Sequence, residues 1–77
     1  MHYKFQITNS RGTISKYFTH SKRLFLKKLR TIKFVEDGLK VFIRVNYGDD
    51  SHNEGEYETE IDVWNAVNAF MQEGKQQ

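Results

Sequence analysis

Acidic side chains crowd the stretch from residue 49 to residue 62, where the sequence offers its most chemically capable cluster. Seven carboxylates occur there: Asp49, Asp50, Glu54, Glu56, Glu58, Glu60 and Asp62. Carboxylates on a rigid scaffold can imitate a row of phosphates, and they steer the encounter with a basic partner. Exposed ion pairs stabilise a fold by only about 0–1 kcal/mol each, so stability explains little of this density. We therefore predict a protein-binding surface formed by Asp49, Asp50, Glu54, Glu56 and Glu58.

The same stretch contains residue types that occur in metal sites and in catalytic sites. Hard carboxylates suit Ca²⁺ or Mg²⁺. Neither calcium-loop register, starting at Asp49 or at Asp50, places both the turn glycine and the last ligand correctly. Ser51 and His52 are merely neighbours in the chain, and the other histidines are scattered, so no nucleophile with an oriented base is visible. The sequence predicts no metal, no cofactor and no enzymatic activity.

Basic side chains concentrate in the other half of the chain. Residues 1–35 carry nine Lys or Arg and no acid, whereas residues 36–77 carry three bases against ten acids. The halves therefore hold charges of +9 and −7 within a net charge of +2. Such polarity bears on partners and association rates, not on fold.

Six of these bases fall within twelve residues: Lys22, Arg23, Lys27, Lys28, Arg30 and Lys33. Each could neutralise a phosphate and release counterions. Tyr3 and Tyr17 could add stacking surfaces if they face outward. The alternative function is thus a nucleic-acid-binding module that uses the basic helix 21–33. The plainer interpretation is a soluble helix whose polar face is basic.

Strand periodicity predicts the elements that position these residues. Alternate positions are apolar or aromatic through residues 39–47, which predicts a central strand with an apolar inner face: Leu39, Val41, Ile43, Val45 and Tyr47. The sequence also predicts a β-hairpin before this strand. A second alternation covers 3–8, a turn follows at 9–12, and a return strand covers 13–18. In the return strand Ile14 and Phe18 share a face, but Lys16 falls between them. The sequence therefore does not decide which face of this strand points toward the core.

Helical periodicity follows twice. Phe25, Leu29 and Ile32 recur at helical spacing, which predicts a helix over about 20–31, capped by Thr19 or Ser21 and followed by a turn at 36–38.

After a polar loop at 48–55, we expect a strand that runs through Ile61. A second helix follows, which Asp62 caps, with Ile61 packed on Ala66. Gly74 is expected to end this helix before frayed residues 75–77. The buried stripe of this helix is expected at Val63, Val67, Phe70 and Met71.

Together the elements predict a single α+β domain over residues 1–77. The order is ββαββα, with a four-stranded antiparallel sheet and both helices on one face. The chain has no cysteine and no apolar run long enough to span a bilayer, so we expect a cytoplasmic protein without a membrane partner.

The second half of the chain carries one resemblance. The segment Phe42-Ile43-Arg44-Val45-Asn46, an acidic loop, and a helix ending Ala66-Val67-Asn68-Ala69-Phe70 are similar in layout to small phage-encoded anti-CRISPR proteins. Those proteins block Cas9 by presenting acids in place of DNA, although the basic first half here is unlike an acidic inhibitor. The resemblance implies a phage or mobile-element accessory protein that binds and modulates a host protein with a basic surface. A homo-oligomer with basic and acidic surfaces in contact is a third possibility.

Overall fold

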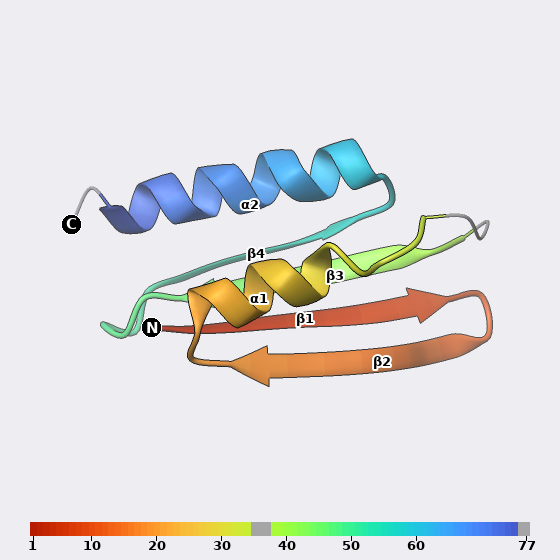
Figure 1. Ribbon diagram of the computed structural model, residues 1–77, viewed down its shortest axis with the longest axis horizontal. Helices are drawn as coiled ribbons and strands as arrows, with labels where there is room; N and C mark the ends of the chain where they lie inside the picture. Colours follow the sequence, from red (N-terminus) through yellow and green to blue (C-terminus); the bar gives the residue numbers. More distant parts are fainter. Residues whose placement is uncertain (35–37, 76–77) are drawn as a thin grey trace.

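The computed structural model describes residues 1–34 and 38–75, with side chains described up to Gln72. Its four strands are β1 (His2–Asn9), β2 (Gly12–Thr19), β3 (Lys40–Asn46) and β4 (His52–Tyr57), and its helices are α1 (Lys22–Leu29) and α2 (Glu60–Lys75). All neighbouring strands are antiparallel, in the spatial order β2-β1-β3-β4. The predicted α+β class and element order are confirmed (Figure 1).

The core lies between the sheet and the two helices. Alternate residues are buried throughout β3 and in the first half of β1, and α1 packs on β1 and β2 while α2 packs on β3 and β4 (Figure 1). One cluster contains the buried residues of both helices and of the strands: Tyr3, Phe5, Phe25, Leu29, Val41, Ile43, Val45, Val63 and Val67. Both helices therefore cover one face of the sheet, and no described element covers the other face. A half-solvated sheet of this kind is common when the strands are antiparallel.

A β-bulge determines which side chains of β2 point toward the helices. Ile7 pairs with Ser15 whereas Thr8 pairs with Thr13, so Ile14 is the extra residue of the edge strand. As a result Tyr17 faces the helices, and Phe18 faces the open side with 55 % of its surface exposed. The predicted turn at 9–12 is present as a two-residue connection between the strands.

Helix α1 is shorter than the predicted span of about 20–31. Ser21 caps it, because the Ser21 hydroxyl oxygen accepts a hydrogen bond from the Leu24 amide at 3.2 Å. Past Leu29 the chain continues for one tight turn, in which the Thr31 and Ile32 amides donate to carbonyl groups three residues earlier. Of the predicted turn at 36–38, only Gly38 lies within the described residues, and its φ of 78° is in the region that favours glycine.

The predicted loop at 48–55 is wrong in its second half. Strand β4 begins at His52, because β3 still offers pairing groups along its free edge, and Asn53 pairs with Val45. Gly55 fits in the strand because the ring of Tyr57 lies where a Gly55 side chain would be. Glu54 consequently stands on a strand and not in a loop.

Helix α2 begins at Glu60, and the predicted strand through Ile61 and cap at Asp62 are wrong. The Thr59 hydroxyl oxygen accepts a hydrogen bond from the Asp62 amide at 3.2 Å, so Thr59 is the capping residue. Ile61 is 73 % exposed and does not pack on Ala66.

The predicted stripe of α2 is confirmed, since Val63 and Val67 are buried and Phe70 and Met71 are half-buried. Gly74 does not end the helix, which runs to Lys75; residues 76–77 lie outside the described part. Neither described helix combines the length and hydropathy needed to cross a bilayer.

Candidate binding surfaces

The six bases of residues 22–33 form one exposed surface, called here the basic face: Lys22, Arg23, Lys27, Lys28, Arg30 and Lys33. Phe25 and Leu29 anchor α1 to the sheet with at most 2 % of their surfaces exposed. Residues four and three apart share a side of a helix. Arg23, Lys27 and Arg30 therefore follow one another along the side of α1 that points away from the sheet.

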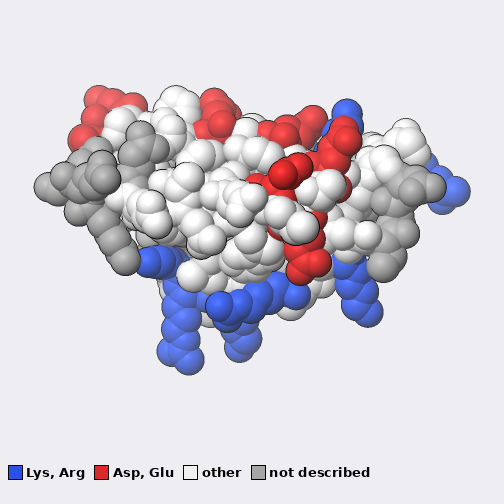
Figure 2. All heavy atoms as spheres, turned by 90° about the horizontal axis from the view of Figure 1, so that it is seen from above, with Lys and Arg blue, Asp and Glu red and all other residues white. Residues whose placement is uncertain are grey.

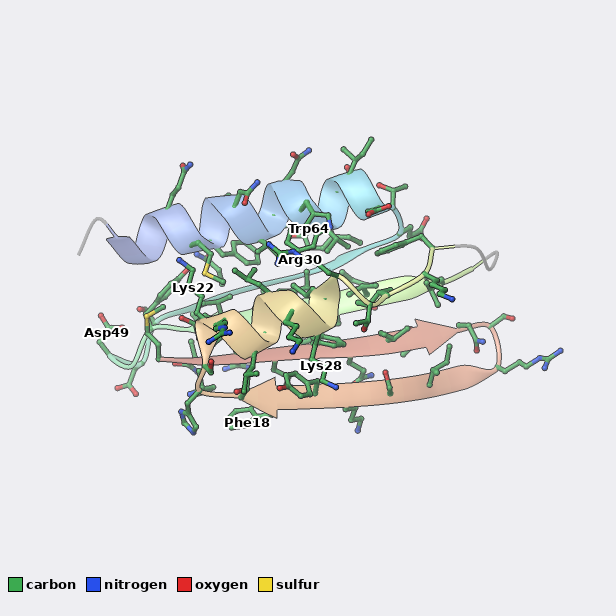
Figure 3. All side chains as sticks on the ribbon, in the orientation of Figure 1. Phe18, Lys22, Lys28, Arg30, Asp49 and Trp64 are labelled. Carbon is green, nitrogen blue, oxygen red and sulfur yellow. The ribbon has the colours of Figure 1, made fainter. Side chains whose placement is uncertain are left out.

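The remaining bases widen this surface to both sides. Lys22 extends toward α2 beside Val67 and Met71, and Lys28 extends toward β2 (Figure 3). Lys33 is exposed in the connection after α1. The basic face is thus wider than the helix itself.

No base of the basic face forms an ion pair with an acid of the described residues, where the ion pairs are Lys40–Glu56 and His52–Glu54. Figure 2 shows lysine and arginine side chains projecting from one side of the molecule, with most acidic side chains gathered toward the other. The positive charge on this side is therefore not neutralised by neighbouring carboxylates of the described chain.

The position of two bases is unfavourable for the helix itself. Lys22 and Arg23 occupy the first turn of α1, which has no acidic residue. A helix N-terminus carries partial positive charge, so cations there are disfavoured by roughly 0.3–1 kcal/mol. Helix stability therefore does not account for their presence.

The two tyrosines proposed as stacking surfaces face the wrong way. Tyr3 is only 4 % exposed and stacks on Phe25, with ring centroids 5.2 Å apart. Tyr17 is half-buried under Lys28, whose Nζ lies 5.7 Å from the ring centre. The prediction fails because side chains at these positions point to the helix-covered face of the sheet.

The open face carries a cluster of rings that the sequence pattern does not predict. The ring of His2 lies 5.0 Å from that of Phe18 and 5.8 Å from that of His20. Desolvation, then the nearby charges of His20, the N-terminal amine and Arg44, lowers the pKa of His2. The register of β2 brings these rings together, and the bulge that sets this register has no clear sequence signal.

Two of the five predicted acidic contact residues have neighbours within the sheet. Glu56 forms an ion pair with Lys40 across β3 and β4, with the Lys40 Nζ 3.9 Å from the Glu56 Oε1. Glu54 lies 3.2 Å from the ring of His52 and stands opposite Arg44 in the register. On the open face of the sheet, Glu56 therefore has a lysine partner and Glu54 a histidine partner.

The other three acids lie at the two ends of β4. Asp49 and Asp50 are in the connection from β3, at the end marked by Asp49 in Figure 3. Glu58 follows the last residue of the strand. Six strand residues span about 20 Å, so these three acids lie at opposite ends of a row that the exposed Glu54 and Glu56 continue along the strand.

The β3–β4 connection has its own local order. Asp49 accepts hydrogen bonds from the amide of Ser51 at 3.2 Å and from the Ser51 hydroxyl. These bonds lower the pKa of the Asp49 carboxyl. Asp50 adopts a φ of 68°, a conformation that Asp tolerates better than most residues. The hydrogen bonds hold the Asp49 carboxylate in place, and both carboxylates are exposed.

Comparison with protein-family models, with curated proteins and with solved structures finds no match to this chain. Among the described residues no group of three or more His, Cys, Asp or Glu side chains is arranged to hold a metal ion. The chemistry that the arrangement offers is electrostatic: an exposed basic face on one side, and carboxylates spread along β4.

Proposed function

We propose that this protein is a non-enzymatic binding module whose basic face contacts the phosphate backbone of a nucleic acid. The observation that supports the proposal is the gathering of six exposed bases around one short helix, without ion pairs to described acids. Each phosphate contact of this kind releases condensed counterions, and it carries little sequence information. The geometry thus favours the alternative function over the acidic contact surface that the sequence placed first.

Salt-dependent binding of a labelled oligonucleotide tests the proposal. Fluorescence anisotropy with 20-nucleotide single-stranded and double-stranded DNA and RNA, from low to moderate salt, gives the slope of log K against log salt. Replacing Arg23, Lys27 and Arg30 together by Gln should reduce the steepness of that slope by roughly 2–3, because about one contact is lost per residue. The affinity at low salt should fall on the order of tenfold or more.

A charge-matched control separates a local surface from net charge. Replacing Lys4, Arg11 and Lys16 by Gln removes the same three charges from the β1–β2 hairpin. This control should weaken binding much less than the α1 variant. Absence of binding at low salt, or equal weakening by both triple variants, would overturn the proposal.

The acidic residues support a second candidate. Asp49, Asp50 and Glu58 are exposed and form no ion pair with a base of the described chain. They could contact a basic host protein, the role that the anti-CRISPR resemblance implies for a phage accessory protein acting in the cytoplasm. If instead the basic and acidic surfaces of two copies meet, sedimentation will show a concentration-dependent homo-oligomer that dissociates in salt.

A further inference from the structure

A hollow of about 550 Å³ opens between the end of α1 and the β1–β2 hairpin. Its walls include five apolar or aromatic side chains from β1, β2 and the segments that flank the undescribed residues: Phe5, Ile7, Tyr17, Ile32 and Leu39. Pockets that hold small organic molecules have volumes of roughly 300–1,000 Å³ and mostly apolar walls. Both the size and the lining of the hollow fall in that class.

The hollow follows from the lengths of the elements. Helix α1 has eight residues and is about 12 Å long. Strands β1 and β2 also have eight residues each, but extended chain of that length spans about 26 Å. The helix therefore leaves the turn end of the hairpin without helical cover. The bulge at Ile14 lies at this end, and Ile14 also lines the hollow.

The charged residues in the described lining of the hollow are all basic. Lys28 and Lys33 line it, and no acid is among its described lining residues; Lys16 borders it as well, but this side chain stands beside Gln6 on the open face of the sheet. Lys28 is placed by its contact with the Tyr17 ring, where the ammonium nitrogen lies 5.7 Å from the centroid (Figure 3). An ammonium group beside an apolar wall is a partner for a single anionic group at the mouth of the hollow.

We propose that this hollow binds an amphipathic organic anion, with an aliphatic body against the apolar walls and a carboxylate at Lys28. Charge complementarity selects an anion over a neutral or cationic molecule of the same shape. The described walls offer three hydroxyl groups, those of Ser15, Tyr17 and Thr31, and Thr31 already donates to the Lys28 carbonyl oxygen at 2.6 Å. A nucleobase, with several polar edge groups to satisfy, fits this lining less well. The inference does not depend on the proposed nucleic-acid binding.

Three eight-carbon probes test the proposal on the intact protein. Sodium octanoate, 1-octanol and octylammonium chloride share one chain and differ in the charge of the head group. In ¹H–¹⁵N NMR titrations, octanoate should shift amides of Ile7, Tyr17 and Ile32, with an affinity at least tenfold above that of octylammonium. Equal affinity for octanoate and octylammonium, or shifts confined to other regions, would overturn the proposal.

Variants locate the head group and the chain. Lys28→Gln should weaken octanoate severalfold and leave 1-octanol binding unchanged, whereas Lys27→Gln, on the outward side of α1, should alter neither. Ser15→Phe should fill the hollow and abolish binding of both probes, and the dispersion of its NMR spectrum reports whether the variant is folded. Equal effects of Lys27→Gln and Lys28→Gln, or full octanoate binding by a folded Ser15→Phe variant, would contradict the site.

Discussion

Tyr47, just after β3, donates its hydroxyl hydrogen to the carbonyl oxygen of Phe70 in α2 at 2.6 Å. The same hydroxyl oxygen accepts a hydrogen bond from the side-chain amide of Asn53 on β4 at 3.0 Å. One side chain therefore joins the end of the central strand, the edge strand and the last helix. The alternation that placed Tyr47 with the apolar residues identified its face, although not the role of its hydroxyl.

Tyr47→Phe should destabilise the fold without changing its architecture. The variant removes one hydrogen bond to α2 and leaves the Asn53 amide without this acceptor, a loss of about 1 kcal/mol. For a domain of this size, that loss lowers the melting temperature by roughly 4–8 °C. Differential scanning calorimetry measures the change. Tyr57→Phe is the control, because the Tyr57 hydroxyl makes no hydrogen bond with a described residue, and a drop of equal size there would contradict the assignment.

Introducing an aspartate on each side of the sheet tests which face is buried and which is open. Ile43 is fully buried on β3, so Ile43→Asp places a carboxylate in the core without a partner and should unfold a domain with little reserve. Gln6→Asp places a carboxylate on the open face beside Lys16 and should leave the protein folded. Circular dichroism distinguishes the two outcomes, and similar melting of both variants would show that the strand facing is wrong.

Long periodic patterns predicted the core well. The alternation of β3 and the helical stripe that begins at Val63 involve several residues each, and burial of one face fixes them. Element boundaries were harder to predict. Thr59 and Asp62 are both good capping residues, and the choice was decided by the hydrogen bond from the Asp62 amide to Thr59, which places the start of α2 at Glu60.

The candidate sites differ in the same respect: some of their features follow from local sequence patterns, and others depend on tertiary structure. Exposure of the basic face follows from local helical spacing, because Phe25 and Leu29 alone decide which side of α1 is buried. The separation of Asp49 from Glu58 depends on β4 starting at His52, and pairing with β3 sets that start. The hollow beside Tyr17 depends on helix length and on a bulge, two features of tertiary structure that hydrophobic periodicity does not report.

Protonation of His2 should weaken the fold below neutral pH. Its pKa is lowered in the folded protein, first by desolvation and then by the positive charges of His20, the N-terminal amine and Arg44. The unfolded chain therefore binds more protons than the folded chain as pH falls below the ordinary value of 6.5. The stabilising contribution is fully present above that value, and it is lost as pH falls through the folded pKa.

NMR titration of the His2 ring measures this directly. The midpoint should lie below 6.5 in the folded protein and should rise in a His20→Asn variant, which removes one of the neighbouring charges. A His2→Gln variant should show a shallower loss of melting temperature between about pH 7 and pH 5. A wild-type midpoint at or above the ordinary value would contradict the predicted direction.

Neutralising the exposed acids should leave the stability of the fold nearly unchanged but slow association with a basic protein. Asp49→Asn keeps an acceptor for the Ser51 amide, and Asp50→Asn suits the left-handed backbone at that position. Together with Glu58→Gln, these changes remove three exposed charges and should move the unfolding free energy by less than about 0.5 kcal/mol for each residue.

If the acidic ends of β4 contact a host protein, association should slow, because rim charges act mainly on the encounter rate. Surface plasmon resonance against a host protein with a basic surface, with a Cas9-type nuclease as the first one tried, gives that rate at two salt concentrations. The charge-matched control is Glu60→Gln with Asp62→Asn and Glu73→Gln, which removes the same number of charges from α2, outside the predicted acidic surface. Selective slowing by the first variant supports the second candidate function. An undiminished rate, or no binding by the wild-type protein, rules out this nuclease as the partner and leaves the basic face as the working surface to be tested with nucleic acid.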